Sequence, residues 1–182
     1  AGNTGVAAYG VIANLWFIVV SMFTGISQGM QPIMSHNYGK GKYGNVNKIL
    51  KYGLILMGTF AAAIYAVMFF GSEYVAAIFN SEHNETLQYI AEEGLKLYYI
   101  ACPFVGFNII ISIFFTSTEY PVPAHIISIL RGFALIIPMA FIMLFAGGRI
   151  GLWMAFPVTE MIVTVIGIIL YIMRNRKLKE HI

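Results

Sequence analysis

The stretch Val6–Ile33, "VAAYGVIANLWFIVVSMFTGISQGMQPI", decides the fold class because it is apolar over most of its length and contains no charged residue. About 20 such residues in a helix cross the hydrocarbon core of a bilayer. No water is available there, so a spanning segment must satisfy its backbone polar groups internally, as a helix does. The stretch therefore predicts a membrane-spanning helix.

Four further apolar stretches follow the first and have similar length. The 182-residue chain is 59% hydrophobic and 10% charged, whereas soluble domains carry about 25% charged residues. The alternating segments of about 10 residues that are typical of β-barrels are not seen. We predict an all-α integral membrane protein in one unit, 1–182, with five transmembrane helices at about 6–33, 49–70, 95–116, 126–146 and 152–173. Asn84 is placed to cap a helix that begins at Glu85 and leads into the third span.

The charged residues predict how the spans are oriented. Basic residues gather in the loop after the first span and at the C-terminus, and acidic residues gather after the second span. An excess of Lys and Arg marks the cytoplasmic side. We therefore predict a multi-pass plasma (inner) membrane protein whose N-terminus lies outside and whose C-terminus is cytoplasmic. Because such an N-terminus is unusual without a signal, we expect a fragment. The basic set is Lys40, Lys42, Lys48, Lys51, Arg174, Arg176, Lys177 and Lys179, and the acidic set is Glu73, Glu82, Glu85, Glu92 and Glu93.

Gly39, Gly41 and Gly44 in "GKGKYG" match the spacing of a dinucleotide-binding loop. That motif needs a preceding strand and an acidic residue about 20 positions further on. Here a membrane span precedes the glycines, and residues 57–66 contain no acid. We interpret the segment as a tight turn whose lysines meet lipid headgroups. No nucleic-acid partner is expected.

A polar stripe runs along the first span. At 100° per residue its members fall within one sector about 100° wide. A polar stripe can face a water-filled transport pathway, or it can join helices by hydrogen bonds, and both alternatives place it inside a bundle. The stripe is Asn14, Ser21, Thr24, Gln28, Gln31 and Ser35.

Glu160 and Arg131 are the charged residues within the later spans. Glu160 lies about 15 Å into the fifth span. Arg131 lies about 10 Å inside the fourth span, measured from its cytoplasmic end. A charged side chain at such depth is costly and needs a partner. Glu160 could take part in transport or make a structural ion pair, and a pair with Arg131 is conceivable. Arg131 could also reach the headgroups.

Asn108 and Ser112, one turn apart in the third span, are weaker pathway candidates, since such residues more often join helices. Cys102 stands alone, and the histidines show no metal-ligand spacing. No Ser-His-Asp or paired-carboxylate set is present. We therefore predict that the chain is not an enzyme and has no catalytic residue, metal site or cofactor.

Several segments resemble the C-terminal half of multidrug and toxic compound extrusion (MATE) transporters, bacterial multidrug branch. They are "GISQGMQPIMSHNYG", "YYIACPFVGFNIIISIFFTS", "IISILRG" and "GLWMAFPVTE". The resemblance covers residue 5 to about 175. It implies that the spans are helices eight to twelve, forming most of the C-terminal six-helix lobe. The missing N-terminal lobe and seventh helix would then be partners.

The resemblance implies part of an ion-coupled antiporter that exports amphipathic, cationic drugs, with H⁺ or Na⁺ as the coupling cation. Some family members carry an acid in the tenth helix, but residues 95–116 contain none. This departure weakens the view that this lobe alone carries the coupling ion. One alternative is a lipid-linked oligosaccharide flippase of the same superfamily, which should show more basic cavity residues. Another is a non-transporting membrane scaffold, which needs neither a buried Glu160 nor a long polar stripe.

Overall fold

The computed structural model describes residues 2–80 and 83–180, and every regular element in these ranges is a helix. Glu82 therefore lies outside the described residues. The first two helices form an antiparallel pair joined by the turn at Gly41 (φ 69°). In chain order the elements are α1 (Gly2–Gly39), α2 (Tyr43–Phe70), α3 (Ser72–Phe79), α4 (Glu85–Tyr98), the 3₁₀ segment η1 (Tyr99–Ala101), α5 (Cys102–Ser117), α6 (Pro121–Ile129), the π-helical segment η2 (Leu130–Ala134) and α7 (Ile136–Glu180).

Within the described ranges, four helical segments are long and apolar enough to cross a membrane, rather than the predicted five. The all-α membrane fold is confirmed, but the count of continuous spans was one too high. The difference lies at 126–146, which is divided among α6, η2 and the start of α7. Pro138 has no N–H to bond the carbonyl of Ala134, the last residue of the π-helical segment, so one α-helical hydrogen bond is missing where α7 begins.

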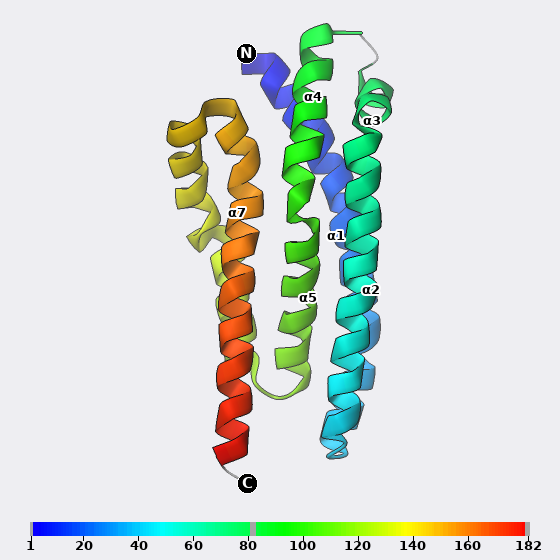
Figure 1. The fold of residues 1–182 in the computed structure, drawn as a ribbon, viewed down its shortest axis with the longest axis vertical. Coiled ribbons are helices and arrows are strands. Elements are labelled where there is room, and N and C mark those ends of the chain that lie inside the picture. The colour runs from blue at the N-terminus through cyan, green and yellow to red at the C-terminus, as the bar shows by residue number, and fades with distance from the viewer. Residues whose placement is uncertain (1, 81–82, 181–182) are drawn as a thin grey trace.

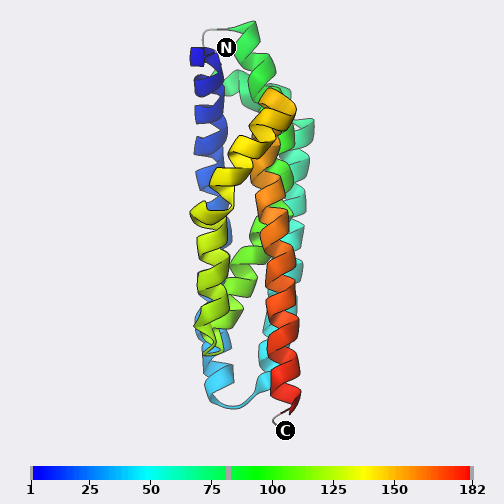
Figure 2. The same cartoon turned by 90° about the vertical axis from the view of Figure 1, so that its left-hand side faces the viewer.

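The helix α7 has two arms that meet at Gly148. This residue has φ 56° and ψ −131°, a conformation that glycine tolerates because it has no Cβ. Figures 1 and 2 show the gold ribbon reversing direction at this point, at one end of the bundle. The chain therefore still passes along the bundle through α6, η2 and the first arm (136–147), and it returns through the second arm (149–180).

The loop between α1 and α2 lies at the same end of the bundle as the C-terminus, and the N-terminus lies at the opposite end (Figure 2). This arrangement agrees with the relative topology that the charges predict. The end with Lys40 and Lys42 is called the basic end below. Its orientation in the membrane stays a prediction.

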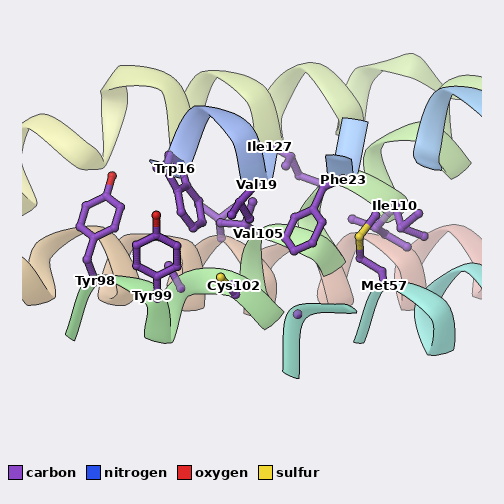
Figure 3. Close-up of a cluster of buried hydrophobic side chains, with 14 of the residues drawn as sticks. Trp16, Val19, Phe23, Met57, Tyr98, Tyr99, Cys102, Val105, Ile110 and Ile127 are labelled. Atoms are coloured by element: carbon purple, nitrogen blue, oxygen red, sulfur yellow. The ribbon is translucent and has the colours of Figure 1, made fainter. Parts of the chain in front are cut away.

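The core lies where α1, α2, α4 and α5 pack together, and α6 and the second arm of α7 add side chains to it. Figure 3 shows part of this core, with side chains from α1, α2, α5 and α6 among those labelled. Trp16 of α1 makes edge-on contacts with Tyr98, Tyr99 and Phe156, with ring centroids 5.5, 5.4 and 5.1 Å away. The hydroxyl of Tyr99 also donates to the carbonyl of Ile12 (3.4 Å). Aromatic contacts of this kind add about 0.5–1.5 kcal/mol each beyond the burial of their area.

We expect Gly94→Ala to destabilise the complete protein. A Cβ at Gly94 would meet Ile12 of α1 and would lie 3.0 Å from the Trp153 ring. Overpacking of this kind costs about 1–3 kcal/mol. Thermal unfolding of purified protein measures the effect. Gly29→Ala is the matched control, because nothing lies within 4 Å of its added Cβ. Equal melting temperatures for the two variants would contradict the close helix packing at Gly94.

Candidate functional site

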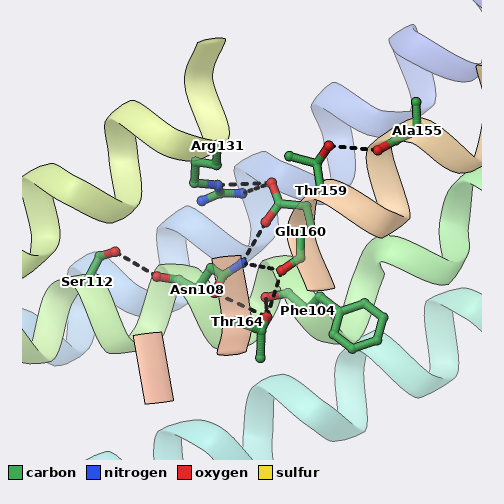
Figure 4. A network of polar contacts seen from close by, with 8 residues as sticks. All are labelled: Phe104, Asn108, Ser112, Arg131, Ala155, Thr159, Glu160 and Thr164. Carbon is green, nitrogen blue, oxygen red and sulfur yellow. Dashed lines mark hydrogen bonds and ion pairs between the residues drawn. The ribbon is translucent and has the colours of Figure 1, made fainter. Parts of the chain in front are cut away.

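The centre of the candidate site is Glu160, on the second arm of α7, which is only 1% exposed. Its Oε1 accepts from Nε of Arg131 at 3.0 Å and lies 3.0 Å from Nη2 of the same side chain (Figure 4). Arg131 belongs to η2, so the ion pair joins the irregular segment to α7. The pair that the sequence made conceivable is therefore formed.

Asn108 of α5 occupies the other carboxylate oxygen of Glu160. This asparagine is fully buried, and its Nδ2 donates to Oε2 (2.8 Å) and to the backbone carbonyl of Glu160 (3.1 Å). The hydroxyl of Thr164 lies 2.9 Å from the same carbonyl and 3.2 Å from Oδ1 of Asn108. The network therefore connects α5, η2 and α7 through one carboxylate, and both of its oxygens have partners.

Ser112, the other weak pathway candidate of the third span, makes different contacts from Asn108. Its hydroxyl donates to the backbone carbonyl of Asn108 on the same helix (2.7 Å). This bond does not cross to another helix, so Ser112 supports α5 locally. Of the two third-span candidates, Asn108 is the one that lies against Glu160.

Arg131 connects the network to a cavity of about 770 Å³. Its side chain is 22% exposed, in contrast to that of Glu160. The cavity lies between the start of α1, the helix α4, and the two arms of α7. Its volume is in the range that holds drug-sized ligands. A molecule in this space would meet the guanidinium group but not the carboxylate behind it.

Two aromatic pairs form much of the cavity wall. Tyr98 stacks on Phe156 with centroids 4.7 Å apart and an interplanar angle of 12°, and Tyr9 stacks on Trp153 at 6.1 Å and 19°. Sequence reasoning did not identify Tyr9, Tyr98 or Phe156 as site residues. A signal was present, because Trp153, Phe156 and Glu160 recur at helical spacing and so share one face.

Arg149 lines the other end of the cavity, next to the Gly148 turn. Its Nε donates to Oε2 of Glu93 on α4 (2.8 Å), and its guanidinium lies 5.4 Å from the centre of the Tyr89 ring. The two arginines of the cavity lining are thus each paired with a carboxylate. Among the described lining residues there is no Asp or Glu.

The polar stripe on α1 lies away from the packed face of that helix. Asn14 and Gln28 are exposed and Thr24 and Gln31 are half-buried. The opposite face carries the buried core residues of α1. The stripe therefore does not join helices within the described bundle, which leaves the pathway interpretation as a prediction for the complete protein.

One family model matches most of the chain. The family model MatE matches residues 1–142. A relative named "FAD transporter", from Shewanella oneidensis (strain MR-1), is 22% identical over 178 residues, which cover 96% of this chain and 37% of that protein. The chain therefore spans little more than a third of this relative's length.

Solved structures of transporters show the same fold. A MOP superfamily transporter from Pyrococcus furiosus, described as having a binding pocket of reverse polarity, matches with a TM-score of 0.88 and 18% identity; the match covers 98% of this chain and 40% of that chain. A multidrug resistance MATE family transporter in its outward-facing conformation gives a TM-score of 0.89 at 17% identity, and the match again covers 98% of this chain and 40% of that chain. At these identities the likeness concerns the fold alone.

Proposed function

The chain belongs to the MatE family, and on this premise we propose that it forms part of an ion-coupled antiporter that exports amphipathic, cationic drugs across the plasma membrane. The single observation that carries the proposal is the buried Arg131–Glu160–Asn108 network beside a drug-sized aromatic cavity. A membrane scaffold would need neither feature. Since the chain spans about 40% of the matched structures, the remaining lobe and a further helix are proposed partners.

The cavity suits amphipathic molecules by its chemistry. The faces of Tyr98, Phe156 and Trp153 offer large apolar contacts, and aromatic faces also attract organic cations. The positive charges of Arg131 and Arg149 are balanced by Glu160 and Glu93. The wall is therefore close to neutral, so a cation could approach the rings without facing an uncompensated positive charge.

The hydrogen-bond donors around Glu160 leave this carboxylate little capacity to bind a coupling cation, H⁺ or Na⁺. Both oxygens of Glu160 are occupied by Arg131 and Asn108. The described residues contain no group of three or more His, Cys, Asp or Glu side chains that could hold a metal ion. We therefore propose that the coupling cation binds mainly elsewhere in the complete transporter.

The test uses proteoliposomes that contain the complete transporter. When H⁺ or Na⁺ flows down an imposed gradient, a fluorescent organic cation should move in the opposite direction. Collapse of the ion gradient should stop this movement of dye. Liposomes that contain residues 1–182 alone should show no such movement, because the proposal requires both lobes. Dye movement at the same rate with and without the H⁺ and Na⁺ gradients would overturn the proposed coupling.

A second candidate substrate class is an aromatic anion. The observation that favours it is that Arg131 and Arg149 line the cavity, whereas the carboxylates that balance them are not among its described lining residues. The Shewanella relative is named for transport of FAD, which is aromatic and anionic. The same proteoliposomes distinguish the classes: FAD uptake without movement of the cationic dye would favour the second candidate.

We expect Gln28→Leu to change which drugs the complete transporter exports, with little effect on folding. Gln28 is exposed on α1, and its loss removes a hydrogen-bonding group from the proposed pathway. Efflux of a panel of dyes measures the change, which should be several-fold for some dyes. Met22→Ala is the control, because Met22 is exposed on α1 outside the stripe. Unchanged selectivity with reduced thermal stability would contradict the pathway interpretation.

A further inference from the structure

A second hollow, separate from the aromatic cavity, lies between α2, α5 and the second arm of α7. Its volume is about 330 Å³. Phe107 and Ile111 contribute to it from α5, which lies between the other two helices in Figure 1. We call this hollow the α2–α7 groove. It shares no lining residue with the aromatic cavity.

The groove is polar at one end and apolar at the other. The helix α2 runs away from the basic end of the bundle, while α5 and the second arm of α7 run towards it (Figure 2). The polar residues of the lining, Asn47, Lys51 and Tyr171, therefore lie nearest the basic end, where Leu50 lies beside them. Leu54 and Ile168 lie further into the predicted hydrocarbon region. This order matches that of a lipid, with a polar headgroup at the interface and an apolar chain below it.

The length of the groove also fits one leaflet. Asn47 and Ile55 are two turns apart on α2, which corresponds to about 12 Å along a helix axis. Half of the hydrocarbon core is about 15 Å thick. An acyl chain could therefore lie along the groove while its headgroup stays at the membrane surface.

The charge near the polar end favours a negative headgroup. The helix α2 contains Lys48 and Lys51 and no acidic residue. The ion pairs found in the described part of the chain, Arg131–Glu160 and Arg149–Glu93, involve neither lysine. Basic residues near a membrane surface attract anionic lipids. The amide of Asn47 and the hydroxyl of Tyr171 add hydrogen-bond donors beside Lys51.

We propose that the α2–α7 groove is a binding site for an anionic phospholipid of the inner leaflet. The acyl chain lies along Phe107 and Ile168, and the phosphate accepts from Lys51, Asn47 and Tyr171. Most of the lining is apolar, so a free phosphate ion would gain only the contacts at one end. The site does not depend on which compound the protein transports.

Native mass spectrometry of the complete transporter in neutral detergent tests the proposal. Phosphatidylglycerol should bind more tightly than phosphatidylcholine of the same chain length, and inorganic phosphate should not compete. Lys51→Gln should weaken phosphatidylglycerol binding about five-fold, the effect of one basic residue near the surface. Lys48→Gln is the matched control: it removes the same charge from the same helix, but Lys48 does not line the groove.

A second variant tests the apolar part of the site. Ile55 is 55% exposed and lines the groove, so Ile55→Trp should fill it without disturbing the core. This variant should lose bound lipid of both headgroup types while its melting temperature without lipid stays unchanged. Equal losses for Lys48→Gln and Lys51→Gln would overturn the proposal, because they would indicate general attraction to a basic surface. Equal binding of the two lipids by the unaltered protein would overturn it as well.

Discussion

The Arg131→Met variant of the complete transporter is expected to lose about 3–5 kcal/mol of unfolding free energy. This change leaves the carboxylate of Glu160, which is only 1% exposed, without its positive partner. Asn108 still donates one hydrogen bond, but an amide does not balance a charge. Reversible unfolding in mixed micelles measures the loss.

Arg149→Met provides the control for this expectation. Arg149 is also paired with a glutamate and also lines the cavity, but the side chains of that pair are 45% and 17% exposed. Exposed ion pairs contribute about 0–1 kcal/mol. The double variant Arg131→Met/Glu160→Gln should recover much of the loss, because no buried charge then lacks a partner. Equal losses for Arg131→Met and Arg149→Met would contradict a special cost of burial at Glu160.

The general arrangement could be predicted from the sequence because it depends on length and hydrophobicity. The apolar stretches gave the positions of the spans, and the depths of Glu160 and Arg131 made their pairing conceivable. Asn84 accepts from the N–H of Leu87 (3.0 Å), as its position before Glu85 predicts. Such features are local, or depend only on the direction of the spans.

The rest depends on how the helices pack, which a single sequence does not reveal. The apolar pattern at 126–146 predicts a continuous span, and it gives no sign that the chain passes through a π-helical segment at 130–134. The aromatic cavity brings Tyr9, Tyr98 and Phe156 together from three distant parts of the chain. Likewise, Glu93 pairs with Arg149, which is 56 positions further along the chain. Helical spacing predicts no contact between residues so far apart.

Glu160→Gln is expected to lower stability by several kcal/mol while the pH dependence of efflux keeps its shape. The carboxylate accepts from Arg131 on one oxygen and from Asn108 on the other, so each of its oxygens already has a hydrogen-bond donor. A glutamine side chain keeps one acceptor but places an NH₂ group towards Asn108 or Arg131, where it meets another donor. It also leaves the charge of Arg131 without a counter-ion. This outcome would identify Glu160 as the structural anchor of α5, η2 and α7.

The opposite outcome would assign Glu160 to proton exchange. In that case Glu160→Gln would insert and unfold normally, but efflux would become independent of pH. Glu93→Gln is the matched control, since it removes a carboxylate that also pairs with an arginine but lies near the bundle surface. Efflux by purified variants at several external pH values, together with their unfolding free energies, separates the two roles. Normal stability combined with an unchanged pH profile would contradict both, because the network would then contribute neither to folding nor to coupling.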